Sequence, residues 1–118
     1  MLIIRKSQIE VLSRYMLRRF EDRMISHLRS AFTEKTIGME DKELRTIIQS
    51  GIKRAESYEV TDETDVERFL DCMVRHGHDF DTNPRTSWAG EILGRQGLSG
   101  TEKMNHIDEY ELFVSPGY

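Results

Sequence analysis

Proline is nearly absent from this chain, and no other feature of the sequence restricts the fold so strongly. The 118 residues include only Pro84 and Pro116, so the first 80 residues contain none. Proline interrupts an α-helix because it lacks the backbone N–H and its ring clashes with the preceding turn. The first part of the chain can therefore form long helices, interrupted only by glycine and short polar turns.

Apolar residues in this part recur at steps of three and four positions, the spacing that places them on one face of a helix. The spacing predicts three main helices, over Ser7–Ala31, Asp41–Tyr58 and Thr61–His76. Gly51 lies on the apolar stripe of the second helix. It indicates either a close crossing with another helix or a tolerated defect.

Short polar signals mark the ends of these helices. Ser7 and Glu10 have the spacing of a capping box, in which two side chains bond the free N–H groups of the first turn. Thr61 is expected to cap the third helix, because an acidic first turn follows it. Gly77 suits a left-handed C-cap at its end.

The chain changes character after Gly77, where turn-forming residues lead to Pro84. We expect a short fourth helix from Thr86 or Ser87 to Leu93, a flexible linker marked by Gly94, Gly97 and Gly100, and a last short helix. That helix would begin at a Thr101 cap and end near Tyr110. The tail, residues 111–118, is expected to be extended or flexible.

We therefore predict an all-α protein with a three-helix bundle-like core, one or two short C-terminal helices and a flexible tail. Residues 1–93 would form the helical domain, and residues 94–118 would dock on the same domain. At ~100–150 residues per domain, the length corresponds to one domain.

Composition excludes some classes of protein. No apolar run approaches the ~20 residues of a membrane helix, and the opening apolar run is too short for a secretory signal. Cys72 is the only cysteine, which precludes an internal disulfide and fits the cytoplasm. A net charge of -4 and a pI near 5.6 argue against general nucleic-acid binding.

A group of imidazoles and carboxylates follows the third helix, at His76, His78, Asp79 and Asp81. These residue types can ligate zinc, but the string matches the pattern of metallo-β-lactamase-like hydrolases only superficially. The same region matches the start of a calcium-binding EF-hand loop, yet Pro84 stands where that loop needs glycine. We favour a structural role for these residues, in which His76 complements the helix C-terminus and the aspartates shape the turn.

The sequence contains no motif for nucleophilic catalysis or phosphate binding. Cys72 falls among apolar residues of the third helix and is expected to be packed. The prediction is a protein that is not an enzyme, with no catalytic residue, metal or cofactor.

Charge and apolar residues instead favour protein binding. Residues 1–30 hold seven basic and three acidic residues, whereas residues 59–83 hold two basic and eight acidic ones. Such polarity can steer a partner, or the acidic and basic helices can face each other or stay solvated. The C-terminal part carries more apolar surface than two short helices readily cover, and Trp and Arg often anchor interfaces. The predicted partner-binding residues are Phe80, Trp88, Ile92, Leu93, Phe113, Arg14 and Arg18.

Several strings between residues 3 and 93 form a recognisable pattern. Three of them are Ile4-Arg-Lys-Ser-Gln-Ile-Glu, Arg19-Phe-Glu-Asp-Arg-Met-Ile-Ser-His-Leu-Arg and Leu44-Arg-Thr-Ile-Ile-Gln-Ser-Gly-Ile-Lys-Arg-Ala. The others are residues 58–70 and the block Asp79-Phe-Asp81…Pro84…Trp88-Ala. In these strings the chain resembles a family of small bacterial proteins that accompany type VI secretion effectors and their spike-tip proteins.

The resemblance implies a helical co-chaperone or adaptor in the cytoplasm that helps load an effector onto the secretion spike. Its partner would be a larger chaperone or the effector itself, in a hetero-oligomer, without nucleic acid or membrane. Two other functions remain open: an immunity protein that neutralises a toxin, and a helical DNA-binding regulator that uses the basic first helix.

Overall fold

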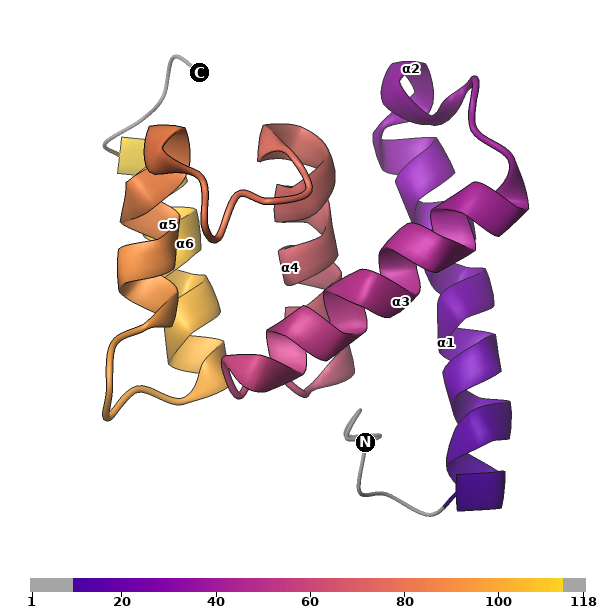
Figure 1. Ribbon diagram of the computed structural model, residues 1–118, viewed down its shortest axis with the longest axis horizontal. Helices are drawn as coiled ribbons and strands as arrows, with labels where there is room; N and C mark the ends of the chain where they lie inside the picture. Colours follow the sequence, from indigo (N-terminus) through magenta and orange to yellow (C-terminus); the bar gives the residue numbers. More distant parts are fainter. Residues whose placement is uncertain (1–9, 114–118) are drawn as a thin grey trace.

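The computed structural model describes residues 10–113 of the chain, with side chains from Arg14 onward. In this part the protein is all-α, without a β-strand, which confirms the predicted fold class (Figure 1). The elements are α1 (Glu10–Ala31), α2 (Thr33–Thr36), α3 (Asp41–Ser57), α4 (Glu63–His76), the 3-10 turn η1 (Pro84–Thr86), α5 (Ser87–Leu93) and α6 (Gly100–Phe113).

The helices form a flat arrangement of 41 × 37 × 21 Å with α4 at its centre. α4 contacts α1, α3 and α6, while α3 runs diagonally from α1 across α4. α5 packs against α6 at the opposite end of the molecule from α1 (Figure 1). α4 therefore joins the helices at the two ends of the molecule.

Gly51 lies where α3 and α4 cross closely. A Cβ atom there would lie 2.4 Å from Leu70 Cδ2 and 2.7 Å from Met73 Sδ. These distances are shorter than van der Waals contact, so the absence of a side chain allows the two helices to approach. Of the two interpretations that the sequence left open, the close crossing is the one that the structure supports.

Aromatic rings fill the centre of the core. Phe69 on α4 is fully buried and lies between Tyr58 and Phe80, with ring centroids 6.2 Å and 5.1 Å away. Offset and edge-on ring pairs add about 0.5–1.5 kcal/mol beyond the apolar area they bury. Phe69 therefore joins the middle of α4 to the end of α3 and to the turn that leads to α5.

Several predicted helix boundaries agree with the structure. α3 and α5 end within one residue of their predicted limits. Gly77 closes α4 with a φ of 117° and donates its N–H to the Met73 carbonyl, as expected of a C-cap. The Ser7–Glu10 capping box lies outside the residues whose side chains are described.

Other predicted boundaries were wrong. α4 is capped by Asp62 rather than Thr61, because the Asp62 carboxylate accepts a hydrogen bond from the Thr64 N–H. Gly100, expected in a linker, is the first residue of α6.

α6 itself is as long as α4 and continues past Tyr110 to Phe113, so residues 111–113 are helical rather than part of a tail. Glu111 accounts for the extension, since it is held by Arg75 and His76 of α4. Residues 114–118 of the expected tail lie outside the described part of the chain.

Candidate protein-binding surfaces

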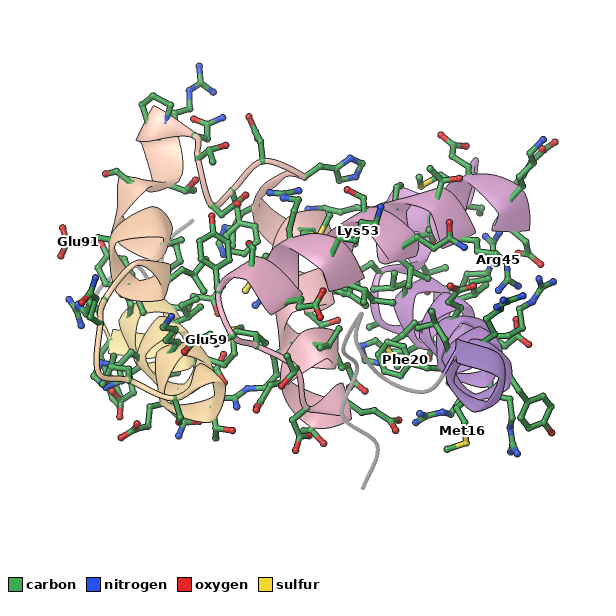
Figure 2. The ribbon with its side chains drawn as sticks, turned by 60° about the horizontal axis from the view of Figure 1, so that its bottom comes forward. Met16, Phe20, Arg45, Lys53, Glu59 and Glu91 are labelled. Carbon is green, nitrogen blue, oxygen red and sulfur yellow. The ribbon has the colours of Figure 1, made fainter. Side chains whose placement is uncertain are left out.

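The first turns of α1 form an exposed basic and apolar surface, which we call the basic end of α1. Tyr15 is 62% exposed, Met16 is 37% exposed, and Phe20 is the first side chain of the described part to be buried. In Figure 2, Met16 points away from the body, whereas Phe20 points toward it. The basic end consists of Arg14, Tyr15, Met16, Arg18 and Arg19.

An arginine of α3 pairs with the two carboxylates that lie next to this surface on α1. Arg45 donates to Glu21 Oε1 at 2.8 Å and to Asp22 Oδ1 at 2.6 Å, and these two hydrogen bonds raise the pKa of Arg45. Arg18 approaches Asp22 only to 4.0 Å. Within the described chain, Arg14 and Arg19 pair with no carboxylate, and Arg19 lies over the Tyr15 ring at 5.9 Å. The basic end therefore keeps a net positive charge.

A second cluster lies where α5 and α6 meet the end of α4. Trp88 stacks on Tyr110 with ring centroids 4.3 Å apart, and the His76 ring meets Trp88 edge-on at 5.5 Å. His76 also binds Glu111, which Arg75 holds through two hydrogen bonds of 2.9 and 3.0 Å. Trp88 is half-buried and is thus engaged within the molecule on at least two sides.

The end of α6 is apolar and exposed. Leu112 is 68% exposed and Phe113 is 75% exposed. Phe113 follows Tyr110 by three positions, a spacing that places both on one side of the helix. Half-buried Trp88 and Tyr110 therefore lie near the side of α6 from which Phe113 projects. We call Leu112 and Phe113 the apolar end of α6.

The predicted partner-binding residues other than half-buried Trp88 divide into two groups. Phe80 and Leu93 are fully buried and Ile92 is 4% exposed, so these three contribute to the core rather than to the surface. Arg14, Arg18 and Phe113 are exposed. They do not share a face, because the start of α1 and the end of α6 lie at opposite corners of the molecule (Figure 1).

The structure adds Tyr15, Met16, Ile37 and Leu112 to the exposed apolar residues. Met16 lies on the apolar stripe of α1, and this spacing predicts that its side chain is buried. Its exposure could have been predicted only from its arginine neighbours, Arg14, Arg18 and Arg19, and from its place at the end of a long helix.

The histidine and aspartate side chains after α4 bind separate partners. His76 contacts Glu111, His78 is exposed, and Asp79 approaches the Asn83 amide at 3.3 Å. Asp81 is buried, forms an ion pair with Arg54 and accepts a 2.6 Å hydrogen bond from the Tyr58 hydroxyl. Asp79 and Asp81 thus hold the turn through polar contacts, whereas His76, predicted to complement the end of α4, joins α4 to Glu111 of α6.

Cys72 is fully buried, and burial, followed by the charge of Glu111, raises the pKa of its thiol. A thiol with a raised pKa is a poor nucleophile at neutral pH, because the thiolate is the reactive form.

An acidic cleft of about 640 Å³ opens between the start of α4 and the start of α6. Asp65 in its wall is bound by Arg68 at 2.9 Å and by the Thr101 hydroxyl. The carboxylates that line the cleft attract positive charge. They belong to Glu56, Glu59, Asp62 and Asp65.

No family model, curated protein or solved structure matches this chain. None of the described helices has the length and apolar character needed to cross a membrane.

Proposed function

We propose that this chain is a non-catalytic accessory protein that binds another protein through the basic end of α1. The observation that carries the proposal is the exposure of Tyr15 and Met16 among Arg14, Arg18 and Arg19, with Met16 pointing away from the body in Figure 2. Apolar residues surrounded by charge are typical of an interface with a desolvated centre and a polar rim. The partner would present an acidic rim around an apolar centre, and the complex would be a hetero-oligomer.

The resemblance to proteins that accompany type VI secretion effectors makes the proposal more specific. In this role the chain acts in the cytoplasm as a co-chaperone or adaptor, and it helps load an effector onto the spike. The partner is the effector or a larger chaperone. The apolar end of α6 gives a second contact at the opposite corner of the molecule, which suits an adaptor that joins two proteins.

Pull-down of the effector or its chaperone by the tagged chain tests the proposal. Arg14→Glu combined with Arg18→Glu should reduce capture by at least about tenfold, since charges at a rim control association and orientation. Lys53→Glu is the matched control, because Lys53 is exposed on α3 away from the basic end (Figure 2). Capture that is equal for all three proteins would refute the assignment of the basic end.

An immunity protein is the second candidate, and the acidic cleft favours it. A cleft lined by four carboxylates fits a basic segment, such as the active-site rim of a nuclease toxin. Co-expression separates the two functions: an immunity protein rescues cells from the toxin, whereas a co-chaperone promotes secretion without rescue.

A further inference from the structure

Three side chains with metal-ligating atoms meet between α1 and α4. His27 lies on α1, and Glu67 and Asp71 lie on α4 with the four-residue spacing that places both on one helix face. His27 Nε2 is 2.8 Å from Asp71 Oδ1 and 3.6 Å from Glu67 Oε2. The three ligand atoms all lie within 4.8 Å of one another.

These separations suit a shared ion. Zinc binds imidazole nitrogen and carboxylate oxygen at about 2.0–2.2 Å, so neighbouring ligand atoms in such a site lie about 3–3.5 Å apart. All three donors are half-buried on facing helices, and small side-chain rotations would bring them to these distances. They would occupy one side of the ion and leave its other positions to water.

The charges around the cluster also favour a divalent cation. The nearby arginines are engaged elsewhere: Arg23 pairs with Glu63, and Arg75 pairs with Glu111. In the described chain no Lys or Arg forms an ion pair with Glu67, whose carboxylate faces His27. Glu67 and Asp71 together offer two negative charges to one site, which a single divalent ion would balance.

We propose that His27, Glu67 and Asp71 form a site for a divalent transition-metal ion, with Zn²⁺ preferred. A mixed set of one nitrogen and two oxygen ligands favours Zn²⁺ over Mn²⁺ and strongly over Mg²⁺. The bound ion would join α1 to the central helix α4. It would thereby fix the direction in which α1 presents its basic end.

The experiment is calorimetric titration of Zn²⁺ into the full, untagged, chelator-treated chain, with thermal unfolding as a second readout. We expect one ion per chain and a rise in Tm with Zn²⁺. Glu67→Gln should weaken binding by at least about tenfold and abolish the rise in Tm. This variant retains the 2.8 Å contact between His27 and Asp71, so it should fold normally. His27→Gln should have the same effect on Zn²⁺.

His106→Ala is the matched control, because it removes a histidine of α6 outside the cluster. It should leave the affinity for Zn²⁺ unchanged. The site is refuted if Glu67→Gln and His27→Gln bind Zn²⁺ as tightly as the unmodified chain, or if loss of His76 or His78 abolishes binding instead. If the unmodified chain does not bind Zn²⁺ and its Tm does not change, the proposal is also refuted, and the three side chains form only an ion pair between two helices.

Discussion

Ser99 and Glu102 begin α6 through two reciprocal hydrogen bonds. The Ser99 N–H donates to Glu102 Oε1 at 2.9 Å, and the Glu102 N–H donates to Ser99 Oγ at 3.1 Å. The hydrogen bond from the Ser99 N–H lowers the pKa of the Glu102 carboxyl below its ordinary value of 4.5, and the Ser99 side chain lowers it further. The ionised carboxylate is therefore the form that stabilises the helix start.

Replacement of Glu102 by glutamine should make stability less dependent on pH. A carboxyl whose pKa is lowered by folding stabilises the native state above its unfolded pKa, and this contribution is lost as pH falls through the folded value. We expect the original chain to be the more stable protein at pH 7, and the difference to fade below pH 4.5. Urea unfolding of both proteins at pH 7 and pH 3 measures this difference in stability.

Glu109→Gln, on the exposed side of the same helix, is the control for this comparison. A constant difference between Glu102→Gln and the original chain across the pH range would contradict the role of the ionised cap.

The residue that caps a helix could not be predicted from the sequence where two candidate capping residues lie close together. The spacing of Ser99 and Glu102 is that of a capping box, but Thr101 offers a second cap two residues later, and that choice was wrong. At the start of α4, Thr61 and Asp62 compete in the same way. Local hydrogen bonding does not rank adjacent caps, because the packing of the helix start decides between them.

At the scale of elements, Gly100 determines how closely α6 approaches the turn between α3 and α4. A Cβ atom at Gly100 would lie 2.3 Å from the Glu59 carbonyl oxygen and 2.9 Å from Val60 Cα. Both are backbone atoms, which cannot rotate away as a side chain does. The first turn of α6 therefore fits against this turn only with glycine at its first position.

Substitution of Gly100 by alanine should destabilise the protein, although alanine is the better helix former. We expect a loss of about 1–3 kcal/mol in the free energy of unfolding, the usual cost of overpacking. Gly38→Ala is the control, since a Cβ there meets nothing within 4 Å. Urea denaturation followed by circular dichroism measures both, and equal stability of the two variants would contradict the close approach.

The sequence predicts the helices that have regular apolar spacing. It does not predict which residues of other helices their side chains contact. α3 and α5 follow their patterns closely. Phe80, Ile92 and Leu93 were instead expected on the surface, because two short helices could not cover them. The longer α6, held by Glu111 against α4, belongs to the same core through Met104 and Ile107. Contacts between residues over 30 positions apart leave no trace in local spacing.

At the scale of the whole molecule, helix ends provide the exposed apolar surface. The flat arrangement places α1 at one end and α5 and α6 at the other, so a helix that extends past its neighbours exposes part of its apolar stripe (Figure 1). Arg14, Arg18 and Phe113 were predicted as partner-binding residues, the arginines from the charge of the first helix and Phe113 from the apolar C-terminal part, and all three are exposed. Tyr15 and Met16 were not predicted, because their exposure depends on the length of α1 relative to α3.

The reactivity of Cys72 can show whether the helices unfold together in one cooperative step. It lies fully buried on α4, the helix that contacts α1, α3 and α6, so a reagent reaches its sulfur only when α4 separates from its neighbours. Burial also raises the pKa of the thiol, which keeps it protonated in the folded chain. We expect labelling by a disulfide reagent to be at least about 100-fold slower than for glutathione, and its urea midpoint to coincide with that of circular dichroism. Rapid labelling in native buffer would instead show that α4 opens locally.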